Sequence, residues 1–140
     1  NYKAGKKLHE LGACNNCHFY GNEFPKQGPQ TWAPNLALSK ERLQPEWLID
    51  WLRDPQIIMP GTKMPAPYLP DTELLSLPDA KSDWGKYVLA LNGDKEQMLA
   101  GLRDYMYTIK GQTDITDEIQ KYFKKHGYEF ELEEEEDDDW

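Results

Sequence analysis

Both cysteines of this chain and one of its three histidines lie within five residues, where Cys14, Cys17 and His18 form a C-x-x-C-H pattern. Thiols at this spacing can each form a thioether with one vinyl group of a haem, while the adjacent imidazole reaches the iron. A dithiol redox pair would not require His18, and it is expected beside a βαβ unit. A zinc site would need a second pair of ligands, which this segment lacks. The pattern therefore favours covalent attachment of one haem c, with His18 as an iron ligand.

A low-spin haem that transfers electrons needs a second axial ligand, and the usual partner of His is a Met thioether. The chain offers four Met. Met98 and Met106 fall on the apolar face of an expected helix, where Met usually fills the core. Met59 and Met64 lie in the proline-rich stretch IIMPGTKMPAP, and residue type alone leaves both open.

Three motifs in this order, GACNNCH, APNL at 33–36 and PGTKMP at 60–65, resemble the class I monohaem cytochrome c family. The resemblance implies that Met64 is the distal iron ligand. It also implies that the carbonyl of Pro34 accepts a hydrogen bond from the His18 imidazole, and that Leu36 packs on the haem. The fold implied is all-α, with a few helices around one covalent haem c.

The remaining Trp and His side chains can be explained by structural roles as well as by roles at a haem. The indole N–H of Trp32 could reach a haem propionate, because a buried Trp usually finds an acceptor, but simple core packing is the alternative. Trp47 and Trp51 share one helical stripe and are expected to be structural. His9 stands where the family often has an aromatic residue and is expected to pack, whereas His126 is expected to be solvated.

Apolar periodicity predicts helices and no strands. The clearest helix begins after Asp94, a good N-cap, and ends at Gly111. Five prolines in residues 55–70 exclude helix there, and residues 69–93 read as an irregular insertion. Gly5 would let a second helix approach the first one closely. The helices expected in chain order are residues 2–16, 45–53 with a turn from Ser39, 94–110, and a segment from Ile115.

Length and charge predict one domain with an appendage, since 140 residues with 39% hydrophobic content build a single core. We expect a cytochrome-like domain over 1–111 and an extension over 112–140, in which an amphipathic helix precedes an acidic tail. Lys and Arg balance Asp and Glu up to residue 128, so the net charge of −9 resides in 129–140. A neutral body with an acidic tail argues against nucleic-acid binding, and it predicts that any electrostatic partner of the tail is basic.

No run of the chain is long and apolar enough for a membrane span, and the opening residues lack the apolar stretch of a signal peptide. The chain is expected to be soluble and to have been processed or excised. The resemblance implies an extracytoplasmic compartment, periplasmic or equivalent. This agrees with the use of both thiols for haem attachment, which would leave no free cysteine.

The resemblance implies one-electron transfer by a His/Met-ligated haem, as a carrier or as the cytochrome domain of a larger respiratory or redox protein. Both axial positions would be filled by the protein, so no enzymatic reaction is expected. Redox proteins are the expected partners, and membership of a membrane-bound complex is compatible with the chain. The alternative is a haem enzyme, or a gas or redox sensor, in which Met64 is displaced.

Overall fold

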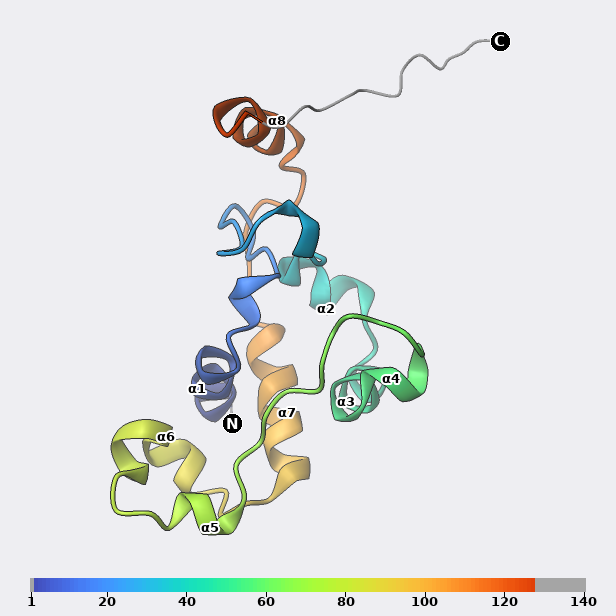
Figure 1. The fold of residues 1–140 in the computed structure, drawn as a ribbon. Coiled ribbons are helices and arrows are strands. Elements are labelled where there is room, and N and C mark those ends of the chain that lie inside the picture. The colour runs from blue at the N-terminus through green and yellow to red at the C-terminus, as the bar shows by residue number, and fades with distance from the viewer. Residues whose placement is uncertain (1, 128–140) are drawn as a thin grey trace.

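The computed structural model describes residues 2–127, which form helices and loops without a β-strand (Figure 1). The expected all-α class is therefore confirmed for this part of the chain. None of its helices is both long and apolar enough to cross a membrane. The helices are α1 Tyr2–Gly12, α2 Ser39–Arg42, α3 Pro45–Arg53, α4 Pro55–Ile58, α5 Thr72–Leu75, α6 Ala80–Leu89, α7 Lys95–Met106 and α8 Thr116–Lys125, with short 3-10 turns at Cys14–Asn16, Pro29–Thr31 and Leu36–Leu38.

The crossing of α1 with α7 forms the centre of the molecule, and α6 also packs against α1 (Figure 1). Gly5 and Gly101 meet at this crossing. A Cβ on Gly5 would lie 1.8 Å from the carbonyl oxygen of Gly101, so the two backbones are in direct contact. The close approach expected at Gly5 is confirmed, and only a residue without a side chain fits there.

Around this crossing lies one apolar core, to which α1, α3, α6 and α7 contribute. Met98 and Met106 are buried in it, as expected for core residues. Fully burying such a side chain stabilises the fold by about 1.5–3 kcal/mol. The largest side chains that are almost completely buried are Leu48, Val88, Met98, Leu99 and Leu102.

The first helix ends earlier than periodicity predicts, at Gly12 instead of residue 16. Ala13 adopts the left-handed conformation, with φ 57°, and a 3-10 turn then begins at Cys14. A left-handed residue directly after the last helical turn is a usual way to end a helix. The C-x-x-C-H residues therefore lie beyond the helix, in a tight turn of their own.

The expectation that residues 55–70 contain no helix is wrong at their start. Pro55 begins α4, because proline fits the first turn of a helix, where its missing N–H has no partner to lose. Asp54 caps this turn through its carboxylate, which accepts a hydrogen bond from the backbone N–H of Gln56 at 3.2 Å. Beyond α4, residues 59–70 form a loop that begins with a turn at 60–61 and runs to α5 (Figure 1).

The segment 69–93 was expected to be irregular, yet it contains α5 and α6. Asp71 caps α5 by accepting from the N–H of Leu74 at 3.0 Å. In α6 the pattern was hard to read because Gly85, with φ 75°, interrupts the helical backbone and kinks it. A one-turn helix such as α5 and a kinked helix such as α6 leave a weak periodic signal.

The last two helices largely follow the sequence pattern. Asp94 caps α7 as expected, with its carboxylate accepting from the N–H of Gln97 at 3.2 Å, although the helix ends at Met106 and not at 110. The expected helix after Ile115 is α8. The acidic tail from residue 129 lies outside the described residues.

The extension packs against the loop 19–32. Tyr122 of α8 stacks on Phe24 with ring centroids 5.2 Å apart, and Phe123 stacks on Trp32 at 5.8 Å. A Cβ on Gly21 would come within 2.9 Å of the Gly111 Cα, so the backbones touch where the extension begins. Residues 112–125 are thus held on the same segment that follows the C-x-x-C-H motif.

Candidate functional site

The C-x-x-C-H segment forms a compact turn in which the N–H groups of Cys17 and His18 both donate to the carbonyl of Cys14, at 3.3 and 3.0 Å. Cys14 and Cys17 are free thiols, and both are half-buried. Burial raises the pKa of the Cys14 thiol to about 11, so this group is protonated at neutral pH. The pair is therefore available for thioether formation.

His18 is held by a hydrogen bond between its Nδ1 and the carbonyl oxygen of Pro34, at 2.7 Å. A carbonyl can only accept, so the proton lies on Nδ1 and the lone pair of the ring lies on Nε2. Burial lowers the pKa of the imidazole, which favours this neutral form. The contact that the resemblance implied for Pro34 is present, and it leaves the Nε2 lone pair available to a metal ion.

The backbone fixes this arrangement on both sides of the imidazole. His18 and Ala33 form an isolated parallel bridge, and the N–H of Ala33 donates to the carbonyl of Cys17 at 2.8 Å. The N–H of Leu36 donates to the carbonyl of Phe19, also at 2.8 Å. Leu36 itself is buried in the core, with 6% of its surface exposed.

Met64 is half-buried and packs against the core that includes Leu36, whereas Met59 is 57% exposed. The Met64 sulfur accepts a hydrogen bond from the indole N–H of Trp51, at 3.1 Å. The Trp51 ring stacks on Trp47, with centroids 5.4 Å apart and planes 10° from parallel. A thioether sulfur has two lone pairs, so one remains free for a metal.

The Trp51–Met64 contact is a feature of the candidate site that the sequence does not predict, because the sequence indicates a structural role for both Trp47 and Trp51. Their place on an apolar helical stripe gave no sign of a bond to Met64. The only available signal was chemical, since a half-buried indole N–H needs an acceptor and a Met sulfur is a weak one.

The loop that carries Met64 is braced mainly by side chains. The Gln56 amide oxygen accepts from the N–H of Gly61 at 3.0 Å, and its NH₂ donates to the carbonyl of Thr62. The Thr62 hydroxyl accepts from the N–H of Met64 at 3.3 Å. These bonds shape the turn just before the thioether.

Trp32 donates its indole N–H to the carbonyl of Gln27, at 3.1 Å, and its ring packs edge-on against Phe19 at 4.8 Å. Its contact with a haem propionate stays a prediction. His126 is exposed and stacks on Tyr122 at 4.0 Å. Its imidazole also pairs with the Tyr122 carbonyl, at 3.0 Å.

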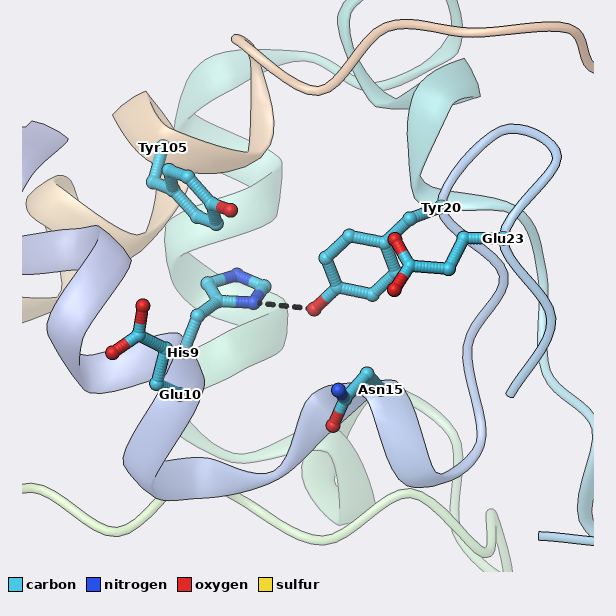
Figure 2. Close-up of a pocket in the computed structure, with 6 residues that line it drawn as sticks. All are labelled: His9, Glu10, Asn15, Tyr20, Glu23 and Tyr105. Carbon is cyan, nitrogen blue, oxygen red and sulfur yellow. Dashed lines mark hydrogen bonds between the residues drawn. The ribbon is translucent and has the colours of Figure 1, made fainter. Parts of the chain in front are cut away.

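His9 packs as expected, and 5% of its surface is exposed. Its Nδ1 is 3.0 Å from the hydroxyl of Tyr20, and its ring meets the ring of Tyr105 edge-on at 4.9 Å (Figure 2). This His–Tyr pair ties α1 to the segment that follows the C-x-x-C-H motif.

The residues present fit a covalently attached haem with two protein ligands. Two free thiols, an imidazole with its lone pair on Nε2, and a Met sulfur with a spare lone pair are the groups such a cofactor requires. Within residues 2–127, no cluster of three or more His, Cys, Asp or Glu side chains could hold a metal ion.

Comparison with known proteins leaves the class of the chain open. A scan against protein-family models finds no matching family. Searches of curated proteins and of solved structures find no significant match either. The residues of the site therefore carry the functional conclusion.

Proposed function

We propose that the chain is a class I monohaem cytochrome c that transfers single electrons. The observation that carries this proposal is the hydrogen bond from His18 Nδ1 to the Pro34 carbonyl inside a C-x-x-C-H segment. It selects the tautomer that ligates iron through Nε2, and it fixes the plane of the ring. A haem c bound in this way supplies an iron centre that gains and loses one electron without breaking a bond.

The chain's own residues set the properties of that centre. The Pro34 carbonyl makes the imidazole a stronger donor, because it accepts a hydrogen bond from the Nδ1–H group. On the other side, the Trp51 N–H holds the Met64 sulfur in one orientation and withdraws electron density from it. A weaker thioether donor favours the reduced form, so Trp51 should raise the reduction potential.

If His18 and Met64 both held the iron of a bound haem, no coordination position would be left for a substrate, so the proposed role is that of a carrier and not of an enzyme. It acts alone or as the cytochrome domain of a larger redox protein, in an extracytoplasmic compartment where haem c is attached. Its partners are redox proteins. The competing function is a haem enzyme or sensor in which Met64 gives way to an external ligand.

The test is to produce the full chain together with a haem c maturation system and to record its visible spectrum. We expect one covalent haem per chain and, in the oxidised protein, the red-region band that reports a Met–iron bond. The matched control is the double variant C14A/C17A, which should carry no covalent haem. A protein with covalent haem but without the Met–iron band would favour the enzyme or sensor, and a chain that never acquires haem would contradict both.

A further inference from the structure

A pocket lies between α1, α7 and the turn that follows the C-x-x-C-H motif (Figure 2). Its volume is about 170 Å³, which is room for a small polar group and not for a porphyrin. None of the residues proposed to hold haem lines it. Its walls are formed by His9, Glu10, Asn15, Tyr20, Glu23 and Tyr105.

Two carboxylates, those of Glu10 and Glu23, border this pocket, and both residues are exposed. Within residues 2–127, the ion pairs that form engage Arg53 and Arg103, and neither pocket carboxylate takes part in one. Glu23 is held at the rim because its backbone exchanges two hydrogen bonds of 3.0 Å with Tyr20. The pocket thus carries two negative charges that no cation of the described chain neutralises.

His9 forms the floor, and more than nine-tenths of its surface is buried. Nδ1 pairs with the Tyr20 hydroxyl, whereas Nε2 lies on the Tyr105 side of the ring and has no hydrogen-bond partner within the described residues (Figure 2). Burial lowers the pKa of His9 to about 4, so at neutral pH the imidazole is uncharged. The neutral imidazole therefore forms no ion pair with the two carboxylates and does not balance their negative charge.

The side walls are the aromatic rings of Tyr20 and Tyr105. Burial raises the pKa of the Tyr105 phenol, and the nearby charges of Glu10 and Glu23 raise it further. The rings therefore stay neutral, and neutral aromatic faces attract cations. Two carboxylates, two neutral rings and a neutral imidazole surround one small space, and this set of groups favours a cation over an anion.

We propose that this pocket binds an organic cation that donates hydrogen bonds, namely a guanidinium or primary ammonium group. Glu10 and Glu23 accept its hydrogen bonds, the Asn15 amide oxygen is a further acceptor, and the tyrosine rings contact its face. A bare metal ion fits poorly, because no cluster of three or more ligating side chains exists within residues 2–127. The group belongs either to a small molecule or to an Arg or Lys side chain of a partner protein.

The experiment titrates the full chain, as purified, with methylguanidinium chloride and, in a second arm, with a short neutral peptide that contains one Arg. Heat release or amide chemical shifts report binding, and sodium chloride at equal ionic strength corrects for salt. We expect saturable one-to-one binding. Because hydrogen bonds to charged groups are the strong ones, the double variant E10Q/E23Q should bind at least about tenfold more weakly.

The control variant is E41Q/E73Q, which removes the same charge from α2 and α5 and should leave binding unchanged. Tighter binding of the peptide than of methylguanidinium assigns the cation to a partner's side chain, and equal binding assigns it to a small molecule. Absence of saturable binding, or equal binding by E10Q/E23Q and the wild type, overturns the proposal. Haem content plays no part in these readouts, so they stand apart from the test of electron transfer.

Discussion

The segments that carry the two proposed iron ligands are held in different ways. His18 follows a segment that is held by backbone hydrogen bonds. Residues 15–17 accept these bonds from backbone N–H groups within residues 26–33, at 2.8–3.0 Å. Met64 sits in an extended loop whose contacts come chiefly from the side chains of Gln56, Thr62 and Trp51. Backbone pairing orders a segment before any cofactor binds, whereas side-chain bracing of an exposed loop is weaker.

This contrast predicts which of the two proposed ligands should be displaced first. The imidazole is oriented by the fold itself, because its acceptor, the Pro34 carbonyl, belongs to the paired backbone. The thioether depends on one indole N–H and on packing against the core. We therefore expect the His18 side to tolerate perturbation and the Met64 side to exchange ligands, and five predictions test this.

The largest effect should come from the attachment residues. Cys14→Ala and Cys17→Ala each remove one thioether, so each should reduce covalent haem, and the double variant should lose it entirely. Haem-stained denaturing gels measure this retention. Asn16→Ala, which leaves both thiols in place, is the control. Full staining of either single variant would show that its thiol is not an attachment point.

Ligand exchange on the distal side should follow next. Met64→Ala should abolish the Met–iron band while covalent haem is kept, because the His18 side is formed independently. Met59→Ala should leave the band unchanged, since Met59 is mostly exposed. Visible spectra of the oxidised proteins make the comparison. The reverse pattern would assign the iron to Met59 and would refute the assignment of Met64.

Acid should destabilise the fold through His9, which pairs with Tyr20 in the segment after His18. Burial lowers the pKa of His9 from 6.5 to about 4 on folding. Between these values the unfolded chain binds more protons than the folded one, so stability falls as the pH falls from about 6.5 to 4. The loss has an upper limit of about 3 kcal/mol. His9→Phe should flatten this slope in urea unfolding. An unchanged slope would mean that the His9 imidazole is not the titrating group.

A matched pair of amide substitutions compares the two segments directly. Asn35 makes three hydrogen bonds of 2.9–3.0 Å, two with the backbone of Gly21 and one with that of Ala37. Asn35→Ala should therefore cost about 1–3 kcal/mol in the free energy of unfolding. Gln56→Ala removes exposed bonds of the Met64 loop and should cost less than about 1 kcal/mol. If Gln56→Ala lowered the free energy of unfolding as much as Asn35→Ala or more, the proposed difference between the two segments would be refuted.

The smallest effect should come from Trp51. Trp51→Phe deletes the N–H bonded to the Met64 sulfur at the cost of about 1 kcal/mol, so added imidazole should displace Met64 at about fivefold lower concentration. The reduction potential should also fall. Trp47→Phe keeps the N–H of Trp51 and serves as the control. Identical imidazole titrations for the two variants would show that the bond does not hold the ligand.

Much of the secondary structure was predictable because its signals are local. Pro45 and a short apolar stripe predicted α3 over its observed range, and Asp94 predicted the start of α7. The failures are also local in origin. Pro55 was read as a helix breaker although it occupies a first turn, and Gly85 hid the period of α6.

The chemistry proposed for the motif follows from the local sequence, because Cys14, Cys17 and His18 lie within five residues and need only one turn to come together. The contacts of the other site residues depend on how distant segments of the chain pack. The Trp51–Met64 hydrogen bond and the pocket that His9 lines depend on how separate elements cross and on which way each side chain then points. Periodicity reports that a face is apolar, but the partner of that face is chosen by packing across the whole chain.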